Sequence, residues 1–454
     1  HVAVQMHTCP EFLMCLFGLA KIGAVTVPMN EQYLQAECEY ALDVCEIERA
    51  VVEPCYVELY GDIHAGGRLP KGISVARTTN PMEARGHRIF SELVDAASTE
   101  LAEQRALTPD DVCEILFTSG TTSNPKGVLL THGNMVYSGY YGDWETSMTA
   151  SDRMLTTMPA CHSNFQLAAL TPVLTARATM IVVEKYSASR FWSQVREYRA
   201  TLAQCVAMML RTLMLQPTDP TERDHSLRDM LYFLPVSARE KEAFEERFGV
   251  RILNTYGSTE SIGWVLTDPP TGERKWPSIG RVGLGYEAKI IDENGNELPA
   301  NRVGEICVKG VPGRSLMLGY VGNEKATAEA LTSDGWLHMG DKGYYDEEGW
   351  FFFVDRKSNM IKRAGENIST TEIEGVLAEH PAVKEAAVIG VPDDIRDEAV
   401  KAFILPENGA RIDEEEIIEY CRNNMAAFKV PSFIEVVDDF PRTCSMKIEK
   451  RLLR

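Results

Sequence analysis

The chain has 454 residues, of which 44% are hydrophobic and 25% charged, and its formal net charge is −20. A chain of this length is longer than one hydrophobic core usually supports, so we expect a globular protein of two or more domains. The negative charge argues against nucleic-acid binding, which needs a basic surface.

The cysteines and the apolar runs indicate the compartment. Eleven cysteines are scattered without a Cys-x-x-Cys pair, so we expect reduced thiols, no zinc and a cytoplasmic location. No apolar run reaches the roughly 18 residues of a membrane helix, and no secretory signal is visible. Because the chain opens at His1 within an apolar stretch, we expect a further segment to precede it.

Helices and strands alternate through the first half of the chain. Residues 11–22 have helical spacing, and residues 24–27 are typical of a strand that ends at Pro28. A buried strand is predicted at 112–117, followed by a loop at 118–127 and a helix from 131 to 141. The same alternation predicts strands at 180–183, 231–234 and 251–254 and helices at 189–199 and 239–248. It indicates an α/β fold with a parallel or mixed sheet covered on both faces.

From about residue 280 the pattern favours β-structure. Residues 286–291 and 303–308 flank the turn 293–296, which predicts a hairpin, and a second hairpin is expected around 345–354. Ser369 and Glu372 then form a capping box for a helix that must end before Pro381. Two strands and the acidic helix 414–425 follow. We therefore predict a β-barrel-like subdomain at about 280–354 and a small α+β domain over the last hundred residues.

The ten-residue run 118–127 has the composition of an anion site. It reads Thr-Ser-Gly-Thr-Thr-Ser-Asn-Pro-Lys-Gly. Glycine lets backbone N–H groups approach phosphate oxygens, a helix N-terminus favours negative charge, and Lys126 adds a mobile cation. It is not a standard P-loop, which needs Gly-x-x-x-x-Gly-Lys followed by Ser or Thr. A polar surface loop is the alternative interpretation.

This run resembles the nucleotide-binding signature of the adenylate-forming superfamily, which includes acyl-CoA synthetases, adenylation domains of peptide synthetases and luciferases. The resemblance implies that a carboxylate is activated with ATP and that the loop grips the β- and γ-phosphates. The residues it assigns to the nucleotide here are Thr118, Ser119, Gly120, Thr121, Thr122 and Lys126.

Residues 256–260, Tyr-Gly-Ser-Thr-Glu, follow a predicted strand, so their side chains should lie at the carboxyl edge of the sheet. They resemble the superfamily's Tyr-Gly-x-Thr-Glu motif. By that resemblance Tyr256 stacks on adenine, Asn254 lies near the adenine edge, Thr259 contacts the α-phosphate and Glu260 holds Mg²⁺. A hard cation prefers such oxygen ligands, although a solvated surface carboxylate is the alternative for Glu260. Two further nucleotide-binding positions are Gly257 and Ser258.

Asp341, in His-Met-Gly-Asp, resembles the aspartate that accepts hydrogen bonds from both ribose hydroxyls, with Met339 in place of the usual threonine. Residues 354–362 resemble the interdomain hinge, in which Arg356 reaches the ribose and Ser358 is the pivot. An ordinary strand end is the alternative. The implied domains are a large one over 1–355 and a small C-terminal lid over 356–454.

The C-terminal run 441–448 resembles the loop that carries the catalytic lysine, here Lys447. A cation between the carboxylate and the α-phosphate stabilises both as they react; a solvated terminal lysine is the alternative. Two positions depart from the superfamily pattern. Met446 stands where glycine is usual, and residues 234–237 replace a Gly-Gly-Ala or Gly-Gly-Glu run beside adenine.

His162 resembles the position between the acyl pocket and the CoA tunnel, with a packed core histidine as an equal alternative. In the second half of the reaction, the resemblance brings Gly365 to the pantetheine tunnel and gives Lys362 a supporting role.

Segments outside the nucleotide motifs narrow the resemblance to one subfamily, the bacterial crotonobetaine/carnitine-CoA ligases. These segments are 184–188, 276–283, 359–363 and 395–399. The implied enzyme is an acid–thiol ligase that uses ATP, Mg²⁺ and CoA on a small carboxylate, with no nucleic-acid partner and no membrane span. The alternatives are an adenylating domain that loads a carrier protein and a weakly active nucleotide-binding homologue. The acyl substrate and the oligomeric state stay open, a homo-oligomer included.

Overall fold

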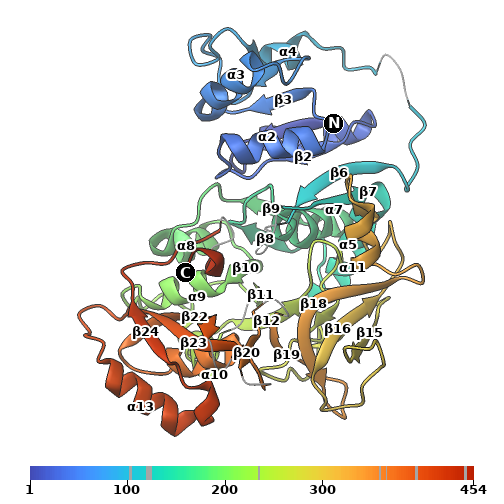
Figure 1. Cartoon of the computed structure of the whole chain (residues 1–454). Coiled ribbons are helices and arrows are strands. Elements are labelled where there is room, and N and C mark those ends of the chain that lie inside the picture. The colour runs from blue at the N-terminus through green and yellow to red at the C-terminus, as the bar shows by residue number, and fades with distance from the viewer. Residues whose placement is uncertain are drawn as a thin grey trace.

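The computed structural model describes residues 1–101, 105–118, 125–233, 236–356, 359–363, 366–393, 397–443 and 447–453. For residues 356, 362, 366, 367 and 397 it describes only the backbone. Four sheets organise these residues, and Figure 1 shows the N-terminal lobe above two lower lobes, one formed by β15, β16, β18 and β19 and one by the C-terminal end of the chain.

The first sheet has eight strands in the order β17-β7-β6-β2-β1-β3-β4-β5. The inner strands β6, β2, β1, β3, β4 and β5 run parallel, whereas β7 and β17 add an antiparallel edge. Its strands are β1 (Val2–Gln5), β2 (Thr26–Pro28), β3 (Arg49–Val52), β4 (Ile73–Val75), β5 (Arg88–Ile89), β6 (Val112–Phe117), β7 (Gly127–Thr131) and β17 (Gly319–Tyr320). The helices of this part are α1 (Pro10–Lys21), α2 (Gln35–Val44), η1 (Pro54–Tyr56), α3 (Val57–Ala65), α4 (Phe90–Ala96) and α5 (His132–Thr146).

The second sheet has seven strands in the order β14-β13-β12-β11-β10-β8-β9, parallel from β12 to β9. Its strands are β8 (Arg153–Thr156), β9 (Thr179–Val182), β10 (Leu202–Val206), β11 (Asp229–Phe233), β12 (Arg251–Tyr256), β13 (Leu266–Thr267) and β14 (Arg281–Val282). Its helices are α6 (Ser163–Phe165), the π-helix η2 (Gln166–Leu170), α7 (Thr171–Ala176), α8 (Ala188–Glu197), α9 (Ala207–Met214) and α10 (Ala238–Phe248). One apolar core joins this sheet to the first, because it includes Val4 and Leu116 as well as Leu202 and Leu253.

The third sheet is antiparallel and has the order β15-β16-β18-β19. Its strands are β15 (Glu287–Ile291), β16 (Gly304–Lys309), β18 (Trp336–Tyr345) and β19 (Phe351–Arg356), and α11 (Glu324–Ala330) precedes β18.

The fourth sheet has the order β21-β20-β23-β22, with β24 added to β23. Its strands are β20 (Ile361–Arg363), β21 (Glu366–Ile368), β22 (Val383–Asp393), β23 (Asp397–Pro406) and β24 (Phe433–Val436). The helical segments are α12 (Thr370–Ala378), α13 (Glu414–Asn424), η3 (Ala427–Lys429) and η4 (Lys450–Leu452). Two apolar cores belong to this part alone, one of them under α12 and α13.

The predicted α/β architecture is confirmed: a large part with mixed sheets, a β-rich segment and a smaller α+β part with its own cores. The predicted capping box forms only in part: the Ser369 hydroxyl accepts a hydrogen bond from the Glu372 N–H at the start of α12, whereas the Glu372 carboxylate accepts from Lys429 Nζ.

The helix predicted at 131–141 is confirmed, because α5 spans His132–Thr146, but a strand separates this helix from the loop 118–127. Residues 127–131 form β7, which pairs antiparallel with β6, and α5 begins only at His132 with Thr131 as its N-cap. Val128 and Leu130 are buried and Leu129 is partly buried between the neighbouring strands β6 and β17, so tertiary pairing decides the conformation of this run. The described ends of the loop therefore belong to two paired strands, and α5 begins after β7.

Among the described residues, no helix combines the length and apolar character needed to cross a membrane.

Candidate active site

The loop predicted to bind phosphate closes the β6–β7 hairpin. The Thr118 N–H donates to the Lys126 carbonyl oxygen at 3.0 Å, and Phe117 pairs with Gly127 in the strand register. A Cβ atom at Gly127 would lie 2.7 Å from Val321 Cγ1 and 2.8 Å from Ile115 Cγ2, so glycine is needed where the loop rejoins the sheet. The predicted residues Ser119, Gly120, Thr121 and Thr122 lie outside the described residues.

Lys126 and Glu260 meet at Tyr320, which the sequence did not single out. The Lys126 Nζ atom lies 4.9 Å from the centroid of the Tyr320 ring. The Tyr320 hydroxyl donates to Glu260 Oε1 at 2.9 Å. Tyr320 lies on β17, the edge strand that pairs with β7, and so the sheet edge brings the loop lysine and the acidic motif residue to one place.

A tight turn after β12 presents Thr259 and Glu260. The Ser261 hydroxyl accepts from the Ser258 N–H at 2.8 Å, and the Met317 N–H donates to the Glu260 carbonyl oxygen at 2.8 Å. At Gly257 a Cβ atom would lie 2.6 Å from the Gly263 carbonyl oxygen, so the close approach of these backbones needs glycine. The turn is therefore held by backbone contacts, while the side chains at its tip stay partly exposed.

Tyr256 and Asp341 contact each other directly. The Tyr256 hydroxyl donates to Asp341 Oδ2 at 2.6 Å, which joins the end of β12 to β18. Asn254 is buried on β12, with its Nδ2 donating to the Ser278 carbonyl oxygen at 2.7 Å. Asp341 is also the register partner of Arg356 on β19, so the two residues predicted to contact ribose lie side by side on adjacent strands.

The hinge residues are placed only in part. For Arg356 and Lys362 the structure describes the backbone, on β19 and β20, and not the side chains. Ser358 and Gly365 lie outside the described residues. Asp355, just before them, is fully buried and accepts hydrogen bonds from the N–H groups of Thr370 and Thr371, at 2.5 and 3.1 Å. It ties the end of β19 to the start of α12.

Thr259 contacts the residue next to His162, and Lys447 acts electrostatically on His162. The Thr259 hydroxyl donates to Ser163 Oγ at 3.3 Å, and Ser163 follows His162 at the start of α6. The His162 ring keeps some solvent-exposed surface, yet desolvation by its neighbours, and secondarily the charge of Lys447, lower its pKa to about 4. The imidazole is therefore neutral near pH 7, and it lies within electrostatic reach of the predicted catalytic lysine.

Lys447 closes a short hairpin loop. The Thr443 N–H donates to the Lys447 carbonyl oxygen at 2.8 Å, and the Lys447 N–H donates to Thr443 Oγ1 at 3.2 Å. Arg442 and Ile448 form the bridge at its base. Met446, the predicted departure from glycine, lies outside the described residues.

The second departure, at residues 234–237, has a local structural role at its end. Leu234 and Pro235 lie outside the described residues. Ser237 is the N-cap of α10: its hydroxyl accepts from the Glu240 N–H at 3.2 Å, and its own N–H donates to Glu240 Oε2 at 2.8 Å. A serine here starts the helix, and this explains its presence.

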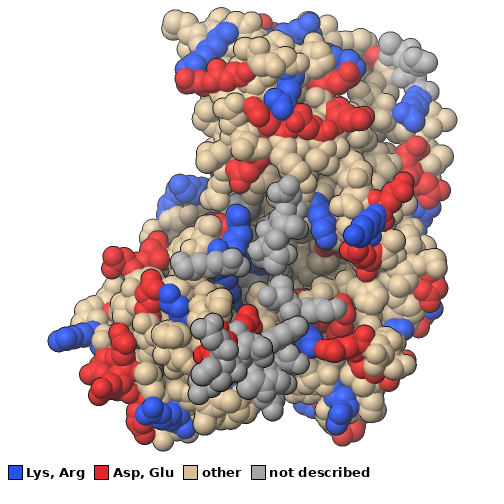
Figure 2. Space-filling model, in the orientation of Figure 1, with Lys and Arg blue, Asp and Glu red and all other residues tan. Residues whose placement is uncertain are grey.

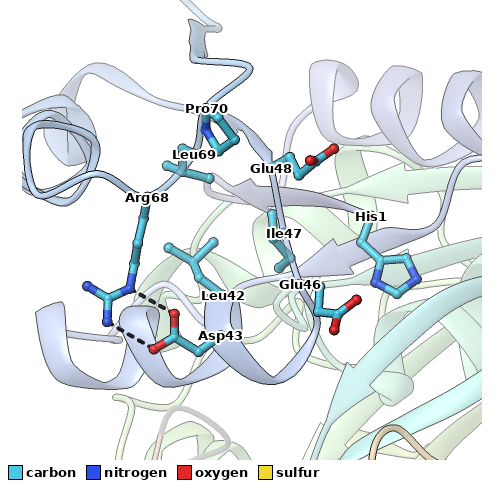
Figure 3. A pocket seen from close by; sticks show the side chains of 9 residues that line it. All are labelled: His1, Leu42, Asp43, Glu46, Ile47, Glu48, Arg68, Leu69 and Pro70. Carbon is cyan, nitrogen blue, oxygen red and sulfur yellow. Dashed lines mark hydrogen bonds and ion pairs between the residues drawn. The ribbon is translucent and has the colours of Figure 1, made fainter.

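The face drawn in Figure 2 is hollowed in its middle, between the N-terminal lobe and the two lower ones, and Lys and Arg side chains border the hollow on both sides. Acidic side chains are spread over the rest of the face. A separate surface hollow lies between the end of α2 and residues 68–70, where Arg68 donates two hydrogen bonds to Asp43 (Figure 3). It contains none of the predicted site residues.

Two family descriptions match the chain: "AMP-binding enzyme" over residues 1–321 and "AMP-binding enzyme C-terminal domain" over residues 372–447. Curated relatives include the crotonobetaine/carnitine-CoA ligases of Salmonella paratyphi A and Salmonella typhi. Each is 47% identical over 454 residues, which is 100% of this chain and 88% of the relative.

Solved structures with the same fold include ATP-bound MatB from Rhodopseudomonas palustris, at 27% identity and a TM-score of 0.90, with 100% of this chain and 88% of that chain covered. Anthranilate CoA ligase AuaEII in complex with anthranoyl-AMP is 26% identical, with a TM-score of 0.90 and coverage of 100% and 86%. Apo MatB, at the same identity and coverage as the ATP-bound form, gives a TM-score of 0.76. The arrangement of this chain is thus more similar to the ATP-bound structure than to the apo structure of the same protein.

Proposed function

The chain belongs to the AMP-binding enzyme family, and on that premise we propose that it is an AMP-forming acid–thiol ligase. It activates a carboxylic acid with ATP to an acyl-adenylate and transfers the acyl group to CoA.

The observation that carries this proposal is the convergence of partners on one turn. Within five residues, Tyr256 contacts Asp341, Thr259 contacts Ser163 beside His162, and Glu260 contacts Tyr320 under Lys126. These contacts bring together the residues that we assign to the ribose, to the phosphates and to the carboxylate substrate. The turn that carries them lies at the carboxyl end of β12, where open α/β sheets bind ligands.

In the first step a carboxylate oxygen of the acid attacks the α-phosphorus of ATP. A new P–O bond forms, the bond to the β-phosphate oxygen breaks, and pyrophosphate leaves. Lys447 stabilises the negative charge of the carboxylate and the α-phosphate as they approach, and Thr259 donates to an α-phosphate oxygen. Lys126 and the loop hold the β- and γ-phosphates, while Asp341 and Arg356 hold the ribose.

Glu260 fits the role of magnesium ligand. Its side chain is partly exposed at the tip of a fixed turn, one carboxylate oxygen accepts from Tyr320 Oη at 2.9 Å, and Lys126 Nζ lies over the face of that tyrosine ring. Carboxylate and phosphate oxygens are the ligands that Mg²⁺ prefers. When bound, the ion supplies charge neutralisation on the phosphates.

In the second step the sulfur of CoA attacks the acyl carbonyl carbon, the bond to the AMP oxygen breaks, and the thiol proton goes to solvent. We place the domain boundary at residues 355 and 356 with Ser358 as the pivot. Rotation there withdraws Lys447 and brings Gly365 and Lys362 towards the thiol. Neutral His162 stands between the acyl group and the thiol path.

The substrate class follows from the relatives. Because the curated relatives are named for crotonobetaine and carnitine, we propose a small zwitterionic acid with a quaternary ammonium group. Such a cation favours an aromatic face or a carboxylate.

The test is an incubation of the purified protein with ATP, Mg²⁺ and CoA, with crotonobetaine, carnitine or a panel of short and medium acids. Pyrophosphate, AMP and the acyl-CoA thioester should form in equal amounts with at least one acid. Pyrophosphate without thioester would favour transfer to a carrier protein, and the absence of pyrophosphate with every acid would refute the ligase assignment.

A further inference from the structure

Outside the predicted site, a group of charged side chains joins the large part of the molecule to the fourth sheet. Glu385 on β22 lies between two arginines. Arg442 NH1 donates to Glu385 Oε1 at 3.2 Å, and Arg442 NH2 contacts the second carboxylate oxygen. Arg211 NH1, from α9 of the second sheet, lies 3.7 Å from Glu385 Oε1. Glu385 thus bridges the two parts of the chain.

The position of Arg211 is set from its own side. Arg211 Nε donates to Glu240 Oε1 at 2.7 Å, and the other oxygen of Glu240 accepts from the Ser237 N–H at the start of α10. Since a capping box fixes Glu240 and Glu240 orients Arg211, the guanidinium is held towards Glu385 by α9 and α10 together.

The position of Arg442 is coupled to that of Lys447. Arg442 bridges to Ile448 at the base of the hairpin loop that carries Lys447. Ile448 and the buried Phe440 pack in one core with Phe403 and Leu405 of β23. The base of the loop is therefore fixed to the fourth sheet by apolar contacts, and the Glu385–Arg442 pair fixes it to β22.

The burial of these groups suits a reversible contact. The side chains of Arg211, Glu385 and Arg442 are 32%, 17% and 18% exposed. Such partly buried pairs are stronger than pairs on the open surface, but they avoid the full desolvation cost of a buried ion pair. They can bias an equilibrium between two arrangements without making one of them permanent.

We propose that Glu385 is a positioning residue for the first half-reaction: by pairing with Arg211 it holds the small domain in the arrangement that delivers Lys447. This inference rests on the proposed ligase function. Its specific content is that the Arg211–Glu385 contact is made when Lys447 lies beside His162 and is lost when the small domain turns for the second step.

The test compares Glu385→Gln, Arg211→Met and the double variant in two assays at saturating acid and ATP. Acid-dependent exchange between ATP and labelled pyrophosphate reports the first step, and thioester formation from supplied acyl-adenylate and CoA reports the second. We expect each single variant to lose about tenfold in the rate of pyrophosphate exchange, and the double variant to lose no more than the more impaired single variant. The rate of thioester formation should change less than about twofold in all three.

Arg211→Met is the decisive variant, because it leaves the Glu385–Arg442 pair, and hence the small domain, intact. Glu435→Gln is the matched control. Its partner Lys401, at 2.8 Å, belongs to the same sheet, so both activities should be retained.

Equal losses in the two assays, additive losses in the double variant or unchanged exchange in Arg211→Met would each overturn the proposal. A wild-type protein that exchanges no pyrophosphate with any acid would instead overturn the ligase function itself.

Discussion

The hydroxyl of Tyr256 and the carboxylate of Asp341, 2.6 Å apart, illustrate how single residues build this site. The tyrosine ring is predicted to stack on adenine and the aspartate to accept from ribose. In these proposed roles, their mutual hydrogen bond would set the base and sugar positions relative to each other before ATP arrives, and such preorganisation lowers the entropic cost of binding.

Asp341→Ala should therefore weaken ATP binding more than Tyr256→Phe. The first change removes the ribose acceptor, and we expect the KM for ATP to rise about tenfold or more. The second keeps the ring and removes one donor, with an expected rise of about threefold. Steady-state kinetics with ATP varied measures both, and an equal effect of the two changes would contradict the assigned roles.

The lowered pKa of His162 predicts how the stability of the fold depends on pH. Desolvation, aided by Lys447, lowers its pKa to about 4, below the roughly 6.5 of an unfolded histidine. The unfolded chain therefore takes up a proton at His162 more readily than the folded protein does. The stability linked to the neutral His162 ring is fully present above about pH 6.5 and is lost as the pH falls towards 4.

Lys447→Met should raise the pKa of His162, but not to 6.5, because desolvation is the larger cause and remains. Nuclear magnetic resonance of ring-labelled histidine, followed over pH, measures the change. An unaltered titration would mean that Lys447 does not lie near His162 in solution.

At the scale of elements, the sequence predicted most of the alternation in the second sheet. From 180 to 254 it predicted β9, α8, β11, α10 and β12 to within a few residues, but it missed β10 and α9 between them. The strands β4 and β5 have three and two residues, too short for any periodic signal. Residues 128–130 lie between the predicted loop and the predicted helix and carried no prediction, and their pairing with β6 places them in the strand β7.

Tyr320 could not be found from the sequence for a related reason. It lies 60 residues from Glu260 along the chain, on a two-residue strand. Its place beside Lys126 depends on the pairing of β17 with β7. The motifs supply the candidate residues for the chemistry, whereas the contacts between them come from sheet edges that have no local signature.

The connection between β19 and α12 allows a prediction at this scale. Asp355 accepts from two N–H groups and two hydroxyls at the start of α12. The N–H groups of a first helical turn have no partner within the helix. Asp355→Ala should lower the unfolding free energy of the small domain by about 3 kcal/mol, because the donors stay buried.

Asp413→Ala is the control for that change. Asp413 caps the exposed start of α13 through the N–H groups of Glu415 and Glu416, and its removal should cost about 1 kcal/mol. Hydrogen exchange in α12 and α13 measures both. Equal protection losses in the two variants would contradict the buried role of Asp355.

At the scale of the whole molecule, an acidic chain must bind an anionic substrate. With a net charge of −20, the overall field opposes ATP, and we expect binding to depend on local cations such as Lys126. The site joins the first three sheets, and Lys447 arrives from the last segment of the chain. Binding, chemistry and release can therefore be controlled by how the small domain sits on the large one.

The central claim is that a carboxylate oxygen attacks the α-phosphorus. With the accepted acid labelled with ¹⁸O in its carboxylate, and with ATP, Mg²⁺ and CoA, that oxygen stays on phosphorus when the thiol displaces AMP. Mass spectrometry should find one ¹⁸O atom in each AMP and none in pyrophosphate or phosphate. Unlabelled AMP, or label in inorganic phosphate, would contradict the acyl-adenylate route.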